Sequence, residues 1–170
     1  MSSPDEAFRD FVVNESAGLL HTGWMFTGDW NLAEDLLQTA LVRTWPHWER
    51  ISRDGMPAAY VRTVMARTYA SWSGRRWSAE TPSETLPEHA TEDPGLNAAD
   101  QRDRLVRALA GLPRRQRAVI VLRYYLDLSE QQTADALKCS VGTVKTQASR
   151  GLARLRATSA DWLEMEAERQ

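Results

Sequence analysis

The chain has 170 residues, of which 42% are hydrophobic, and its formal net charge at pH 7 is −2. This length and composition allow one medium domain or two small ones, and they exclude a wholly disordered chain. No apolar run approaches the roughly 18 residues that a membrane helix needs, and the first residues lack a signal segment, so we expect a cytoplasmic protein without membrane insertion. The single cysteine, Cys139, excludes an internal disulfide, and three scattered histidines offer no ligand pair, so we expect neither metal nor cofactor.

The small net charge hides a strong asymmetry along the chain. Residues 78–100 contain six acidic residues and no basic one, whereas residues 101–157 contain 12 basic and 4 acidic residues, a net charge of +8. Residues 158–170 have one basic and four acidic residues. A polyanion such as nucleic acid would therefore bind within residues 101–157.

The N-terminal half predicts a compact helical bundle, because its apolar residues recur at intervals of three and four. A first helix is expected to stop at Gly28, and Asp29 is placed to cap a second, which Pro46 ends or kinks. A third helix is expected to begin near Pro57 and to continue to Trp77. No segment of the chain predicts a strand. Four tryptophans are expected to pack within this bundle: Trp24, Trp30, Trp45 and Trp48.

Residues 78–98 predict a flexible acidic linker. They contain three prolines and five carboxylates, and they are too poor in apolar residues to fold alone. An acidic surface loop of a single domain is the alternative, but structureless loops longer than about 15 residues are unusual within a domain. We therefore predict an all-α protein with two small helical domains, residues 5–77 and 99–157, followed by an acidic tail over residues 158–170.

The C-terminal half has the pattern of a helix-turn-helix. Ser129 and Gln132 have the spacing of a capping box that opens a short helix, which ends near Leu137. Ser140 is placed to cap a longer, basic helix that runs to Arg156. A short helix, a tight turn and a longer basic helix are the elements of this DNA-binding motif.

Within the motif, Ala134 and Val144 are expected to form the contact where the two helices cross. Leu137, Ala148, Leu152 and Leu155 extend the buried side. The opposite face then carries only hydroxyl, amide and cationic side chains, with no acidic residue between positions 141 and 156. This face can donate to phosphates and to base edges in the major groove. It consists of Thr143, Lys145, Thr146, Gln147, Ser149 and Arg150.

The chemistry of these side chains suggests separate roles. Gln147 and Arg150 are candidates for contacts to bases, since an amide pairs with adenine and a guanidinium with guanine. Lys145, Arg154 and Arg156 are candidates for phosphate contacts. A solvated face of a helical bundle is the alternative to DNA binding. Three further cations, Arg114, Arg115 and Arg117, could either contact an external anion or serve only to keep the surface soluble, and both interpretations stay open.

Several stretches together resemble a known family. They are LPRRQRAVIVLRYYLDLSEQQTADALKCSVGTVKTQASRGLARLR in the C-terminal half, and TGDWNLAEDLLQTALVRTW and YVRTVMARTYASWSGRRW in the N-terminal half. The first resembles domain four of bacterial RNA polymerase sigma factors. The whole chain resembles the extracytoplasmic-function group, which keeps only domains two and four, and within it the actinobacterial SigE-like branch.

The resemblance implies where the partners bind. Core RNA polymerase would be contacted through the clamp helices of its largest subunit and through the flap, and an anti-sigma factor is a possible further partner. The helix with Glu34, Asp35, Gln38 and Arg43 would dock on the clamp helices. Promoter DNA at the minus-10 element would meet the helix that starts at Pro57. The residues implied there are Arg62, Arg67, Thr68, Trp72, Arg75 and Arg76.

The aromatic residues of that helix leave alternatives. Tyr69, Trp72 and Trp77 could stack on unpaired bases, but aromatic residues at helical spacing are more often core, an interpretation we favour for Tyr69. Relatives often carry asparagine after arginine where this chain has Arg67 and Thr68, so the mode of minus-10 recognition is left open.

These observations predict a non-enzymatic promoter-specificity subunit, which reads the minus-35 region with domain four and opens the minus-10 region with domain two. A stand-alone helix-turn-helix regulator that acts without polymerase is the rival hypothesis. An enzyme is disfavoured, because the sequence contains no phosphate-binding glycine loop and no nucleophile beside a base.

Overall fold

The computed structural model describes residues 2–72 and 96–168, with side chains for residues 2–72 and 100–158. The chain divides into two compact units, Met1–His89 and Ala90–Gln170. Over the described ranges every regular element is a helix, which confirms the predicted all-α fold with two domains. Most of the predicted linker lies outside these ranges. Its last residues, 96–98, already belong to a helix.

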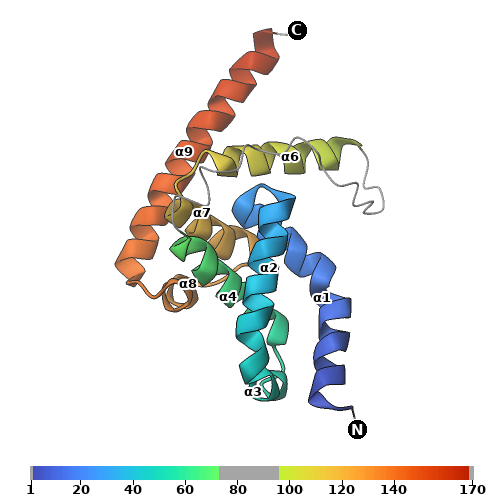
Figure 1. Ribbon diagram of the computed structural model, residues 1–170. Helices are drawn as coiled ribbons and strands as arrows, with labels where there is room; N and C mark the ends of the chain where they lie inside the picture. The colour runs from blue at the N-terminus through green and yellow to red at the C-terminus, as the bar shows by residue number, and fades with distance from the viewer. Residues whose placement is uncertain (1, 73–95, 169–170) are drawn as a thin grey trace. The chain divides into compact units, whose positions relative to one another are not determined.

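The N-terminal unit is a helical bundle. Helix α1 (Pro4–Thr27) and α2 (Trp30–Thr44) form a hairpin, and α4 (Pro57–Ser71) packs against both (Figure 1). A short 3₁₀ turn, η1 (Trp45–His47), and α3 (Trp48–Arg53) lead from α2 to α4.

The predicted caps of these helices are confirmed. Gly28 ends α1 with φ 71°, in the left-handed region that glycine enters without strain. The Asp29 side chain accepts a hydrogen bond from Leu32 N at 3.0 Å and opens α2. Helix α4 begins at Pro57 as expected but ends at Ser71. The rest of the predicted helix, residues 73–77, lies outside the described residues.

The core of this unit lies between α1, α2 and α4. Leu19, Phe26, Leu36, Met65 and Tyr69 are fully buried there, so the prediction that Tyr69 is a core residue is confirmed.

An aromatic cluster closes one end of the bundle. The Phe8 ring centroid lies 5.0 Å from those of both Trp45 and Trp48. Trp48 is buried, as is Trp24, on which Trp30 stacks at 5.0 Å. Trp45 differs from the expectation, because 42% of it is exposed although its ring contacts Phe8.

The C-terminal unit contains α6 (Leu96–Ala110), α7 (Arg114–Ile120), a π-helical turn η2 (Val121–Tyr125), α8 (Glu130–Leu137) and α9 (Val141–Glu168). Helices α7 and α8 pack on α9 (Figure 1). Ser129 Oγ accepts from Gln132 N at 3.0 Å and Gln132 Oε1 accepts from Ser129 N at 2.9 Å, which confirms the capping box. Ser140 Oγ likewise accepts from Thr143 N at 3.0 Å.

Helix α9 is longer than predicted, since its backbone continues beyond Arg156 to Glu168. The sequence from 157 to 168, ATSADWLEMEAE, contains neither glycine nor proline and is rich in good helix formers. The acidic tail therefore continues α9 as a helix.

The predicted helix-turn-helix contact is confirmed. Ala134 and Val144 are buried against each other and against Val119 from α7. Four partly buried residues surround this cluster: Leu137, Cys139, Val141 and Ala148. Cys139 thus serves as a small apolar residue of the turn.

The crossing of α9 and α7 depends on a glycine. A Cβ at Gly151 would lie 2.9 Å from Ile120 Cγ1, closer than van der Waals contact, whereas a Cβ at Gly142 would lie 3.8 Å from its nearest neighbour. Both substitutions by alanine favour the helix intrinsically, so their difference reports the clash. We expect Gly151→Ala to be less stable than Gly142→Ala by about 1–3 kcal/mol in chemical denaturation of the C-terminal unit. Equal stabilities would show that Ile120 moves away freely.

Candidate nucleic-acid interface

Helix α9 presents a polar face opposite its buried stripe. Val144 and Gly151 are buried, and Ala148 and Leu155 are partly buried. Of the predicted DNA-contacting residues, Thr143 and Gln147 are half-buried at the edge of this face. The others are exposed, namely Lys145, Thr146, Ser149, Arg150 and Arg154. None of the seven predicted residues lies on the buried stripe, and together they occupy about half of the circumference of α9.

The hydroxyls at the start of α9 are partly engaged. Thr143 Oγ1 lies 2.9 Å from Ser140 Oγ, and Thr146 Oγ1 donates to Gly142 O at 3.0 Å. Lys145 Nζ lies 3.7 Å from Glu130 Oε2 of α8. Within the described part of the chain, Arg150 and Arg154 make no ion pair, so both guanidinium groups are available to an external anion or base.

Burial separates the three cations of α7. Arg115 is exposed and Arg114 is half-buried, but Arg117 is only 2% exposed. Contact with an external anion is therefore excluded for Arg117 in this conformation. Its position one turn into α7 turns the side chain toward the interior of the unit, which its charge alone did not indicate.

On α4, only some of the residues implied for minus-10 DNA face solvent. Arg67 is exposed and Arg62 is half-buried. Thr68 is buried, and its hydroxyl donates to Val64 O at 2.8 Å, so direct contact of this side chain with DNA is not supported. Trp72 is only 9% exposed and is buried like a core residue in this conformation. Arg75, Arg76 and Trp77 lie outside the described residues.

Arg43 joins α2 to α4. Its Nη1 donates to Thr68 Oγ1 at 2.9 Å, although much of the side chain is exposed. A guanidinium engaged in this way positions two helices of the bundle, and only its remaining donors are open to a partner.

The outward face of α2 carries the other residues implied in polymerase binding. Glu34, Asp35 and Gln38 are all exposed, while Leu36 and Leu37 point into the bundle. Residue spacing on a helix places positions 34, 38, 42 and 45 on the same side.

Two apolar residues on this face are exposed, of which the sequence interpretation overlooked Val42 and assigned Trp45 to the core. Val42 is 73% exposed, and Trp45 follows it at the end of the face. The helical spacing of the sequence could have revealed Val42, because position 42 falls on the same side of the helix as the polar residues 34 and 38. The face is thus acidic toward the start of α2 and apolar toward its end, a combination that favours protein contact.

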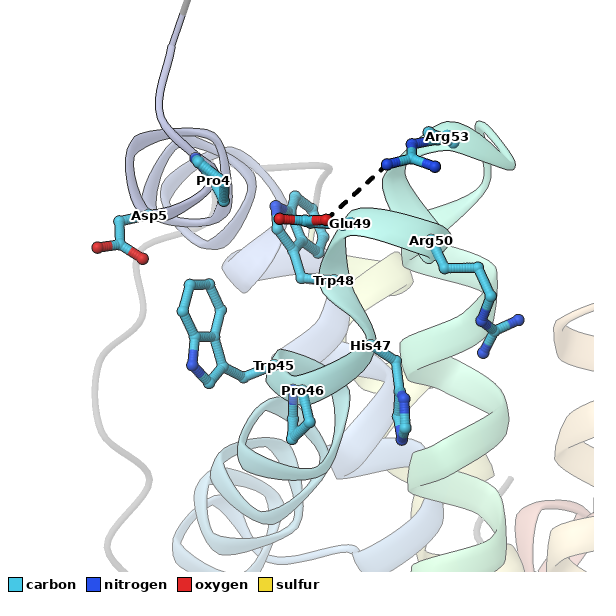
Figure 2. A pocket seen from close by; sticks show the side chains of 9 residues that line it. All are labelled: Pro4, Asp5, Trp45, Pro46, His47, Trp48, Glu49, Arg50 and Arg53. Carbon is cyan, nitrogen blue, oxygen red and sulfur yellow. Dashed lines mark ion pairs between the residues drawn. The ribbon is translucent and has the colours of Figure 1, made fainter.

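A pocket of about 700 Å³ lies beside this apolar end and is lined by Trp45, Trp48, His47 and charged neighbours (Figure 2). Arg53 Nη2 lies 3.8 Å from Glu49 Oε2, so the carboxylate offsets this cation of the pocket. None of the described residues form a group of three or more histidine, cysteine, aspartate or glutamate side chains placed for a metal. No described helix is long and apolar enough to cross a bilayer.

Comparisons with known proteins agree with this architecture. The model of Sigma-70 region 2 matches residues 16–78, and that of Sigma-70 region 4 matches residues 102–155. The RNA polymerase sigma-E factor of Streptomyces coelicolor is 41% identical over 149 residues, covering 88% of this chain and 84% of the relative. The ECF RNA polymerase sigma factor SigL of Mycobacterium tuberculosis is 35% identical over 166 residues, covering 92% of each chain.

A solved structure shares the fold at lower identity. It is the sigma factor RpoE in complex with the anti-sigma factor NepR from Bartonella quintana, with a TM-score of 0.63 and 21% identity over 89% of this chain and 95% of that one. The two region matches and the full-length relatives carry the assignment: this chain belongs to the sigma-70 family, in its extracytoplasmic-function group.

Proposed function

We propose that this chain is an alternative sigma factor that directs bacterial RNA polymerase to specific promoters in the cytoplasm. The observation that best supports this proposal is the cationic face of α9, which contains no carboxylate and lies in a unit that matches region 4. A separate unit matches region 2. A stand-alone regulator would need only the first of these units. The chain's role is binding and positioning, with catalysis left to the polymerase.

In this proposal α9 enters the major groove at the minus-35 element. Arg150, which is exposed and has no ion pair among the described residues, pairs with guanine, and Gln147 pairs with adenine. The cations at the edges of the face hold phosphates and fix the register of the helix. They are Lys145, Arg154 and Arg156.

The N-terminal unit is proposed to bind core polymerase through α2 and to meet minus-10 DNA through α4. Glu34, Asp35 and Gln38 supply polar contacts to the clamp helices, and Val42 adds apolar area. Arg62 and Arg67 are the described candidates for phosphate contacts at the opened strands. Thr68 and Trp72 act beneath that surface, as packing that holds α4 in place.

Two weak DNA-binding modules on one chain gain affinity when a larger assembly fixes their separation. Core polymerase supplies that assembly, and domain four would contact the flap. Because cations such as Arg150 and Arg154 on α9 and Arg67 on α4 are exposed, we also propose that an anti-sigma protein covers them. The RpoE relative, which was solved with its anti-sigma factor, supports this step.

The test is transcription in vitro with purified core polymerase and a template library randomised in the minus-35 and minus-10 regions. The proposal predicts that the chain co-elutes with core polymerase and that transcripts arise from a narrow set of templates. Sequence-specific binding to DNA without core polymerase, and no transcript with it, would instead support a stand-alone helix-turn-helix regulator.

A further inference from the structure

Lys145 has an acidic neighbour from the preceding helix. Its Nζ lies 3.7 Å from Glu130 Oε2, and the two side chains are 64% and 40% exposed. Glu130 is the first residue of α8, where the capping box of Ser129 and Gln132 fixes the backbone and the helix dipole favours a carboxylate. An exposed pair of this kind is weak, so a stronger anion can replace the carboxylate.

The pair borders a shallow pocket of about 280 Å³ between η2, α8 and α9. Arg123, Ser149 and Arg156 also line it, and Glu130 is the one carboxylate among its lining residues. Arg123 already donates to Leu128 O, so it is partly satisfied within the unit. Glu130 therefore acts mainly on Lys145, the cation nearest to it.

We propose that Glu130 is an internal competitor of DNA for Lys145, and that it holds the intrinsic DNA affinity of the α9 face low. This inference rests on the proposed function, since it needs Lys145 to contact phosphate. A phosphate that reaches Lys145 Nζ must displace the Glu130 carboxylate or stand beside it, and either event cancels part of the attraction. A weakened module binds firmly only when polymerase holds it at a promoter, which reduces occupation of random duplex by the free chain.

The charge of Glu130 can be removed with little change of shape by Glu130→Gln. We expect this variant of the full chain to bind a labelled duplex of random sequence about fivefold more tightly in fluorescence anisotropy. In a Lys145→Gln background the same substitution should have no effect, because the competition no longer exists. Asp135→Asn is the matched control, since Asp135 is an exposed acid on the same helix that bonds to Gln131.

Each outcome has a defined meaning when circular dichroism shows that all variants are folded. Equal tightening by Glu130→Gln and Asp135→Asn, or tightening that persists without Lys145, would show a general charge effect and overturn the inference. An unchanged affinity of Glu130→Gln, with Lys145→Gln weaker than the native chain, would overturn the inference alone. Unchanged binding by Lys145→Gln would overturn both the inference and the proposed phosphate contact of Lys145.

Discussion

Arg150→Ala is expected to lower transcription from the selected templates about 10- to 100-fold while leaving the affinity for core polymerase unchanged. The reason is that a bidentate guanidinium–guanine pair contributes about 1–3 kcal/mol of discrimination between bases. Arg150 is exposed on α9, and no carboxylate within the described residues pairs with it, so its donors are free for a base. The measurement is in-vitro transcription from the randomised library, with sequencing of the transcribed templates.

The sequenced templates separate base contact from phosphate contact. Loss of a base contact relaxes the preference at one position of the minus-35 element, and Arg150→Lys should do the same because it keeps the charge but loses the planar fork. Loss of a phosphate contact instead weakens all templates equally and lowers the salt dependence of binding. Arg107→Ala, which removes an exposed arginine from α6 of the same unit, should leave transcription unchanged.

Local signals in the sequence predicted where α2, α4, α8 and α9 begin and where α1 ends, but not α3 or the extension of α9 beyond Arg156. The capping box at Ser129, the stop at Gly28, and the starts at Asp29 and Pro57 each depend on neighbours within a few residues. Such features are visible in sequence because the interacting groups are close along the chain. The contact between Ala134 and Val144 was also predictable, since a tight turn leaves few ways for two helices to cross.

Side-chain burial that depends on distant segments could not be predicted in the same way. Thr68 is buried beside Arg43, which is 25 residues away, so a helical pattern around Thr68 alone cannot show this bond. Arg117 carries a full charge and is nevertheless buried in its unit. Polar residues of this kind look exposed in a sequence because their partners are supplied by the fold.

The opposite error concerns apolar residues. Trp45 was expected in the core because tryptophan is apolar and large, and no exposed role was predicted for Val42. Both side chains are nevertheless accessible at the end of α2. A closed bundle has limited room at its ends, and an apolar residue there stays exposed unless another element covers it. Their position beside Glu34, Asp35 and Gln38 suggests that the missing cover is a partner protein.

Asp35→Arg, which reverses a charge on this face of α2, is expected to weaken binding to core polymerase about 100-fold. Asp35 is exposed on α2, so the substitution leaves the bundle intact, while like charges brought together at an interface cost several kcal/mol. The affinity can be measured by titration of labelled core polymerase. Asp10→Arg, an equal charge change at an exposed position of α1, is the control and should bind normally.

The contributions of the polar and apolar parts of this face to polymerase binding can be distinguished by their dependence on salt concentration. Weakening by Asp35→Arg should diminish as salt screens the repulsion, whereas Val42→Ala should cost about 1 kcal/mol at every salt concentration because it removes apolar area. Both variants should reduce transcription from all templates in proportion, unlike Arg150→Ala. If both variants bind polymerase normally, then polymerase does not contact this face of α2. A template-dependent loss would place this face on DNA, because a polymerase contact is shared by every promoter.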